Sequence, residues 1–241
     1  ISVTLPDISV SLSRIYPFKR KNGVGKEKWF EKISMSYSGY LRNSIDTKEN
    51  KLMQSSLVKD WRNGMQHNIP ISATFTFLKY INISPSFNYT ERWYTSKVMQ
   101  AWNETSNRLM PSDTIYGFNR VYNYNASLSA STTMYGFYKP LPFLGNKVEM
   151  IRHRFEPSIS LSAAPDFGDP RYGFYESYTY MDEDGEMYTN TYSPYANQIF
   201  GPAPQGKQGS LSFSINNNVE MKIRSDEDST GFKKLSLIDK L

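Results

Sequence analysis

The chain has 241 residues, a net charge of +5 and no cysteine. That length can bury a sizeable core in one all-β domain, while the lack of cysteine excludes disulfides and thiolate metal sites. No apolar run approaches the roughly 18 residues of a membrane-spanning helix, and the mean hydropathy is −0.58. These values exclude helical spans but not membrane strands, whose alternating residues average out as polar.

Strict alternation of apolar and polar residues, which is typical of half-buried β-strands, recurs along the chain. It is clearest from Ile69 to Phe77, and it resumes from Ile81 to Tyr89. The three-residue break between these stretches predicts a hairpin. The other alternating stretches predict strands, in chain order, over 8–13, 33–41, 124–131, 155–162, 211–223 and 234–241.

The connections between these strands alternate between long and shorter lengths. Long connections run over 42–66, 94–121 and 164–209, and shorter ones over 17–32, 78–80, 137–154 and 224–233. In an up-and-down sheet alternate connections lie at opposite ends, so all the long loops share one end. Outer-membrane barrels have this asymmetry, with short periplasmic turns and long extracellular loops. The last loop far exceeds a plain connection, and we expect it to fold over or into something.

The residues on the polar face of the strands help to decide whether the apolar face packs against a protein core or against lipid. A soluble sheet turns charged residues to water, whereas the polar positions here are almost all Ser, Thr or Asn. Ile69 to Phe77 covers about 20 Å of an apolar band about 25 Å tall at roughly 40° tilt. Aromatic residues such as Trp93, Tyr94 and Tyr122 lie near strand ends, where interfacial girdles belong. The pattern predicts an all-β, antiparallel up-and-down transmembrane β-barrel segment of about eight strands, with residues 1–241 in one barrel domain.

Candidate catalytic and metal-binding residues are few. His67 and His153 lie beside strand starts among many serines, but no G-x-S-x-G motif supports a Ser–His hydrolase. "MDEDGEM" offers carboxylates but lacks the full EF-hand pattern, and we interpret it as a solvated loop tip: Asp182, Glu183, Asp184 and Glu186. The basic stretch "KNGVGKEKW" lacks Walker spacing, and a solvated turn is its default interpretation. We therefore expect no enzyme, no cofactor and no nucleic-acid partner.

Three prolines interrupt strand interiors. Pro70, Pro85 and Pro157 each remove one hydrogen bond from a strand ladder. They are candidate strand-weakening positions, either as local bulges or edges, or as part of a seam that opens sideways.

The stretch "IRHRFEPSISLSAAPDFGDPRYGFY", in which His153, Glu156 and Pro157 open a strand, resembles the LptD family of lipopolysaccharide-assembly outer-membrane proteins. "SRIYPFKRKNGVGKEKWFEKISMSYS" and "GPAPQGKQGSLSFSINNNVEMKIR" are similar to other parts of a divergent, serine-rich branch of that family. The resemblance covers the whole chain as a middle portion of the barrel. From this resemblance we expect the family's periplasmic N-terminal domain and the strands that meet at its gate to lie outside these 241 residues.

The resemblance implies a barrel in the outer membrane of a Gram-negative bacterium that releases lipopolysaccharide through a lateral gate into the outer leaflet. It implies as partners lipopolysaccharide, outer-membrane lipid, an LptE-like lipoprotein plug and periplasmic bridge proteins. It carries over no catalytic residue, and His153, Glu156 and Pro157 receive only a structural role. The alternatives are a passive porin or nutrient-receptor barrel, or a soluble glycan-binding β-sandwich.

Overall fold

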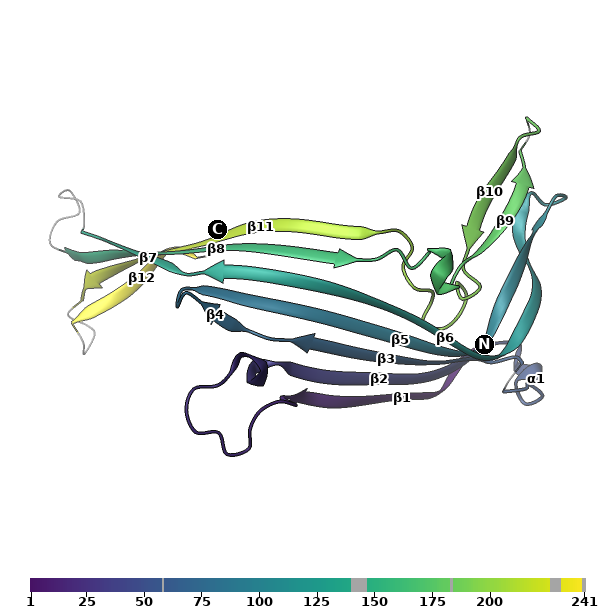
Figure 1. Cartoon of the computed structure of the whole chain (residues 1–241), viewed down its shortest axis with the longest axis horizontal. Coiled ribbons are helices and arrows are strands. Elements are labelled where there is room, and N and C mark those ends of the chain that lie inside the picture. The colour runs from purple at the N-terminus through teal and green to yellow at the C-terminus, as the bar shows by residue number, and fades with distance from the viewer. Residues whose placement is uncertain (58, 140–146, 183, 226–230, 240–241) are drawn as a thin grey trace. The chain divides into compact units, whose positions relative to one another are not determined.

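The computed structural model describes residues 1–57, 59–139, 147–182, 184–225 and 231–239. Most of its regular structure is antiparallel β-sheet, which confirms the predicted fold class (Figure 1). The short helical elements are η1 (Trp29–Lys32), α1 (Glu49–Leu52) and η3 (Pro170–Tyr172). None of the helices among the described residues is long and apolar enough to cross a membrane.

The larger sheet has the hydrogen-bonded order β1-β2-β3-β5-β6-β8-β11-β12, with β4 also paired to β5 and β7 to β8. Its strands are β1 (Ser2–Ile15), β2 (Ser34–Asp46), β3 (Arg62–Ser72), β4 (Phe75–Phe77), β5 (Ile81–Asn103), β6 (Arg108–Thr132), β7 (Met134–Tyr138), β8 (Val148–Ala164), β11 (Gln208–Arg224) and β12 (Phe232–Asp239). The order follows the chain, so the sheet is an up-and-down meander. Among the described residues, β1 and β12 do not pair with each other, and the sheet is open.

Each of the eight predicted strands corresponds to one position in this order. The third position is divided into β3 and β4 by a break at Ala73 and Thr74. The predicted hairpin joins β4 to β5, where Phe77 pairs with Ile81. The eighth predicted strand is β12, and its last two predicted residues, 240–241, lie outside the described residues.

The extent of the long loops needs correction. β5 continues to Asn103 and β6 begins at Arg108, so the range 94–121 is mostly strand rather than irregular chain. The alternation test misses these strand ends because apolar residues fall on both faces there, as at Val98 and Met99. The same effect shortens the loop predicted over 42–66, since β2 ends only at Asp46 and β3 already begins at Arg62.

The chain divides into two compact units, each built from several segments. The first comprises Ile1–Ser72, Ser86–Ala126 and Ala163–Gln208. The second comprises Ala73–Pro85, Ser127–Ser162 and Gly209–Leu241.

The very long connection after β8 folds within the first unit, as its length predicts. It contains a separate hairpin of β9 (Glu176–Met181) and β10 (Met187–Tyr192). It also contributes most of a buried core, whose members are Tyr94 of β5, Val121 of β6, and Phe167, Phe174, Tyr195 and Ala203 of the connection. The Tyr94 hydroxyl donates to the Gly201 carbonyl at 2.6 Å, and burial raises the pKa of the Tyr195 hydroxyl. This connection is therefore packed against β5 and β6.

Candidate functional site

Serine lines one face of the β8–β11 strand pair. Both strands alternate serine with apolar residues, so the period of two places the serines on a common face. Three pairs of hydroxyl oxygens lie within hydrogen-bonding distance across the strands: Ser158 and Ser214 at 2.6 Å, Ser160 and Ser212 at 2.6 Å, and Ser162 and Ser210 at 2.7 Å. We call this arrangement the serine ladder. Each hydroxyl can donate one hydrogen bond and accept two, so the ladder pairs internally and keeps the capacity to hydrogen-bond to water.

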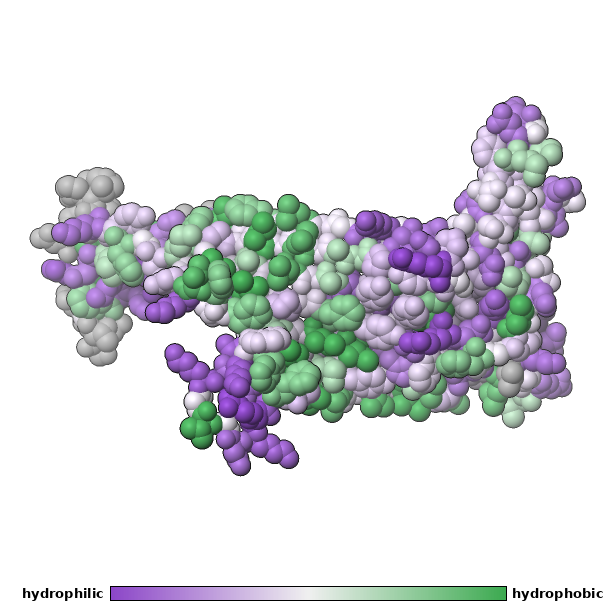
Figure 2. Space-filling model, in the orientation of Figure 1, coloured by the Kyte–Doolittle hydropathy of each residue, from purple (hydrophilic) through white to green (hydrophobic). Residues whose placement is uncertain are grey.

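The opposite face of the same strands is apolar and exposed. Ile159 and Leu161 of β8 are 47% and 53% exposed, and Leu211 and Phe213 of β11 are 71% and 66% exposed. Figure 2 shows hydrophobic side chains gathered along the middle of β8 and β11. Contiguous exposed apolar surface on this scale marks an interaction surface, for lipid or for protein.

Pro70 lies at an interruption in the pairing of β2 with β3. The two strands pair at Met35 and Ile71, and again in the same register at Ser38 and Asn68, but the pairing skips the residues between. Pro70 is one of the skipped residues, and its ring nitrogen has no hydrogen to donate. On its other side Pro70 pairs with β5.

Pro85 lies opposite a strand break, and Pro157 lies opposite the end of a strand. The N–H of Ala73 donates to the Pro85 carbonyl at 3.1 Å, but Pro85 has no N–H with which to complete the pair, and β3 ends there. Continuing the β7–β8 register places Pro157 opposite Thr132, the last residue of β6. Each of the three prolines therefore lies at or beside an irregularity in the pairing of neighbouring strands.

The H-x-x-E-P element connects β8 to its neighbours. His153 Nε2 lies 3.0 Å from Asn217 Oδ1 of β11. Glu156 forms an ion pair with Arg154 and accepts a hydrogen bond of 3.0 Å from the hydroxyl of Thr133, which lies between β6 and β7. These contacts involve the part of β8 that precedes Pro157.

The other histidine lies in an aromatic setting. His67 Nδ1 is 2.8 Å from the Tyr37 hydroxyl, and its ring centroid is 4.3 Å from that of Trp93. The partners of the two histidine rings are thus a tyrosine hydroxyl at His67 and the Asn217 amide at His153.

The acidic stretch organises its own turn. Asp182 Oδ1 accepts hydrogen bonds of 3.0 Å from the backbone N–H groups of Asp184 and Glu186, while Glu183 lies outside the described residues. No group of three or more His, Cys, Asp or Glu side chains among the described residues could hold a metal ion.

The aromatic girdle needs correction. Tyr80, beside the start of β5, is 75% exposed, as the sequence predicts. Trp93 and Tyr122 lie in the middle of β5 and β6 and not near strand ends, because these strands are longer than the alternation predicts. Tyr94, however, is only 1% exposed, because the connection after β8 covers it. Tyr94 therefore belongs to a protein core and not to an interfacial belt.

Sequence reasoning did not identify the aromatic cluster that joins Trp102 of β5 to Tyr178 and Tyr180 of β9. Their ring centroids lie 5.9 Å and 4.7 Å from that of Trp102. A signal was present, because the tyrosines alternate on both sides of an Asp184–Gly185 pair. Asp-Gly flanked by alternating residues is a strong hairpin signature.

An up-and-down antiparallel sheet with a serine-lined face and an exposed apolar face defines a β-barrel segment of the outer-membrane class. The chain belongs to the LptD protein family, whose family model matches residues 1–241. The resemblance to the LptD family is thereby confirmed, while the serine-rich branch and the position within the barrel stay predictions. The family consists of outer-membrane proteins that act in lipopolysaccharide transport and assembly, and it is not a family of enzymes.

Searches among curated proteins and among solved structures found no match to the chain.

Proposed function

We propose that this chain forms part of the wall of an outer-membrane β-barrel that inserts lipopolysaccharide into the outer leaflet. The observation that carries the proposal is the division of β8 and β11 into the serine ladder on one face and exposed apolar side chains on the other. In this arrangement the serine ladder lines the aqueous interior of the barrel. The apolar side chains meet the acyl chains of the membrane.

The energetics favour lipid on the apolar face. Burial of a large apolar side chain such as Phe213 or Leu211 stabilises by about 1.5–3 kcal/mol relative to exposure to water. Left in water, the same face would be an aggregation hazard. The serine ladder suits a hydrated interior, because a hydroxyl buried in lipid without a full set of partners costs free energy.

The proposed partners follow from family membership. They are lipopolysaccharide and outer-membrane lipid, together with an LptE-like lipoprotein plug and periplasmic bridge proteins. In this setting the connections between β2 and β3, between β5 and β6, and between β8 and β11 face the outside of the cell. Pro70, Pro85 and Pro157 are proposed as strand-weakening positions in the wall, and His153 and Glu156 as structural contacts beside one of them.

Site-directed photo-crosslinking in living cells tests the proposal. A photoreactive amino acid replaces Ser160 or Ser212 in the full-length protein, and lipopolysaccharide is detected on the crosslinked product. The matched controls are Ile159 and Phe213, one residue away on the same strands but on the opposite face. We expect lipopolysaccharide adducts from the serine positions that depend on ongoing lipopolysaccharide synthesis.

Two results would contradict the proposal. Absence of lipopolysaccharide adducts at both serine positions would favour a passive porin or a receptor barrel. Adducts to another protein instead of lipid at Ile159 and Phe213 would show that the apolar face is a protein interface.

A further inference from the structure

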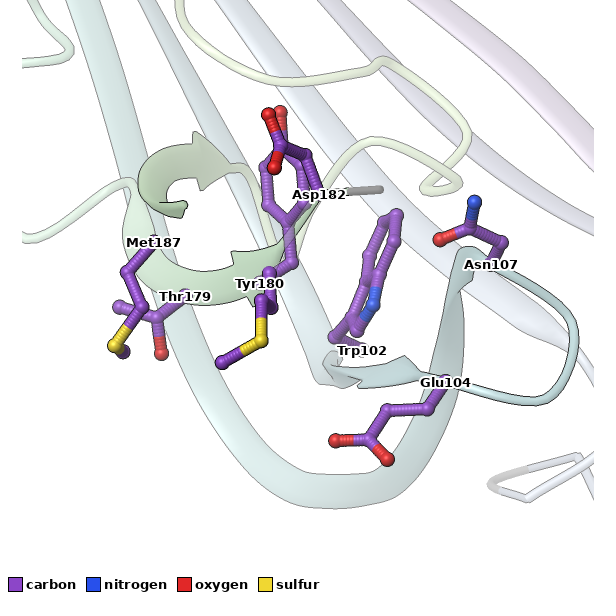
Figure 3. Close-up of a pocket in the computed structure, with 8 residues that line it drawn as sticks. Trp102, Glu104, Asn107, Thr179, Tyr180, Asp182 and Met187 are labelled. Atoms are coloured by element: carbon purple, nitrogen blue, oxygen red, sulfur yellow. The ribbon is translucent and has the colours of Figure 1, made fainter. Parts of the chain in front are cut away.

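A cavity of about 440 Å³ lies between two hairpins of the first unit. Trp102, Glu104 and Asn107 line it from the β5–β6 hairpin, and Tyr180 and Asp182 line it from the β9–β10 hairpin (Figure 3). The family assignment does not require any binding site in this place. The cavity is large enough for one or two sugar rings.

The aromatic wall of the cavity is held in position by ring contacts. The Trp102 ring is nearly parallel to that of Tyr178, at 15°, and its centroid lies 4.7 Å from that of Tyr180. The contacts continue along the hairpin, since Tyr180 also stacks on Tyr188 of β10. Aromatic rings in such contacts need little further ordering when a ligand binds, which favours affinity.

The remaining lining combines acidic and polar groups with the side chains of Met181 and Met187. Glu104 and Asp182 supply carboxylates and Asn107 supplies an amide, while the described lining contains no lysine or arginine. Carboxylates accept hydrogen bonds from hydroxyl groups, and the amide both donates and accepts. Two carboxylates without a basic partner in the cavity repel phosphate and other anions.

We propose that this cavity binds a neutral pyranose saccharide. A pyranose presents a face of C–H groups that packs on an aromatic ring, and an edge of hydroxyl groups that carboxylates and amides recognise. The cavity offers both surfaces side by side, in Trp102 and in Glu104 with Asn107. The saccharide of lipopolysaccharide and an unrelated environmental glycan share this chemistry, so the inference does not depend on the proposed transport function.

An organic cation is the rival ligand, because aromatic faces and carboxylates also attract positive charge. Cation recognition uses rings arranged around the ligand as a cage. Here the Trp102 and Tyr180 rings contact each other, with centroids 4.7 Å apart, which leaves no space for a cation between them. The geometry therefore favours a sugar packed against these rings over a cation enclosed by them.

Calorimetric titration of the detergent-solubilised full-length protein tests the proposal. The probes are maltoheptaose, the dephosphorylated oligosaccharide released from lipopolysaccharide by mild acid, and choline. We expect at least one saccharide to bind. Trp102→Ala should weaken that binding about tenfold, because it removes one aromatic contact with the ligand. Trp102→Phe should retain most of the affinity. Trp61→Ala, which removes a tryptophan outside this cavity, should leave it unchanged.

Glu104→Lys provides a second variant should Trp102→Ala fail to fold, because Glu104 is exposed at the hairpin tip. It should weaken saccharide binding severalfold while leaving the folded structure unchanged by circular dichroism. Binding of only one of the two saccharides identifies the source of the ligand. Binding of choline alone, binding of neither saccharide, or saccharide affinity equal in wild type, Trp102→Ala and Glu104→Lys would overturn the proposal.

Discussion

Leu78 and Lys79 form the tip of the β4–β5 hairpin with φ angles of 48° and 67°. Two consecutive left-handed residues match the twist of a tight hairpin, but a side chain in this region costs roughly 1–2 kcal/mol. Glycine adopts it without that cost, although it loses more entropy on folding. We expect Lys79→Gly to raise the free energy of unfolding by about 0.5–1 kcal/mol, measured by urea titration in lipid vesicles.

Thr76→Gly is the matched control for that prediction, because Thr76 lies in the extended strand β4. There glycine removes a strand-forming residue without relieving strain, so the free energy of unfolding should fall. Equal destabilisation by the two substitutions would contradict the assigned backbone conformation of Lys79.

Glu31 illustrates how one carboxyl group can order a loop. Hydrogen bonds from the Arg20 guanidinium and from the Lys28 N–H, the latter at 2.6 Å, lower the pKa of the Glu31 carboxyl to about 2. Because this folded-state pKa lies below the unfolded value of about 4.3, the interaction stabilises the loop above that pH. We expect the stabilisation to be lost as pH falls from about 4.3 toward 2.

Trp29 fluorescence provides the measurement, since Trp29 is exposed and opens η1, which contains Glu31. Subtraction of the Trp29→Phe spectrum isolates its emission at each pH. Glu31→Gln should remove the acid transition, because an amide does not titrate in this range. Persistence of the transition in Glu31→Gln would assign it to another group.

At the scale of the strand, the N–H group that Pro85 lacks coincides with the end of the hydrogen-bond ladder between β3 and β5. Pro85→Val supplies the N–H that Pro85 lacks, so the backbone opposite Ala73 can complete its pair and join β3 to β4. One restored hydrogen bond contributes about 0.5–1.5 kcal/mol. We expect slow amide hydrogen exchange at the new valine, slower exchange at Phe75 and a small rise in the free energy of unfolding. Pro204→Val, in the connection after β8, is the control.

If hydrogen exchange near the β3–β4 break is the same in Pro85→Val and wild type, the break has another cause. If Pro204→Val slows exchange equally, the effect comes from valine itself and not from the strand ladder.

Element positions could be predicted from the sequence wherever only one face of a strand is apolar. Alternation located β8 and β11, because serine and apolar residues follow a strict period of two in both strands. The same period correctly placed Ser160 and Ser212 on one face of the sheet. It failed beyond Tyr94, where apolar residues occur on both faces. The β9–β10 hairpin was missed for a different reason. Tyrosine has an apolar ring and a polar hydroxyl, so a tyrosine-rich strand shows no clear alternation of apolar and polar residues.

The candidate site was less accessible to sequence reasoning than the fold. The prolines could be recognised individually, but their coincidence with ladder breaks depends on the register of neighbouring strands. The Trp102 cavity joins residues about 80 positions apart, and no local pattern indicates which hairpins meet. Long-range proximity of this kind is a property of the packed core that contains Tyr94 and Tyr195.

At the scale of the molecule, the environment of the apolar face distinguishes a membrane wall from a soluble sheet. Phe213 is 66% exposed in the chain itself. In water, arginine at so exposed a position should change stability by no more than about 0.5 kcal/mol. In a bilayer, arginine near the midplane of a barrel strand should cost about 2–4 kcal/mol.

We therefore expect Phe213→Arg to lower the free energy of unfolding in lipid vesicles by about 2–4 kcal/mol. Ser212→Arg, one residue away on the serine ladder, should cost less, because its side chain faces the hydrated side. Phe213→Ala should cost about 1.5–3 kcal/mol, the transfer free energy, since mobile acyl chains fill the space and add no cavity term. Urea titrations of the three variants against wild type measure these differences. A Phe213→Arg protein as stable as wild type in lipid would contradict a lipid-facing strand, and the apolar face would then have to meet something other than the membrane.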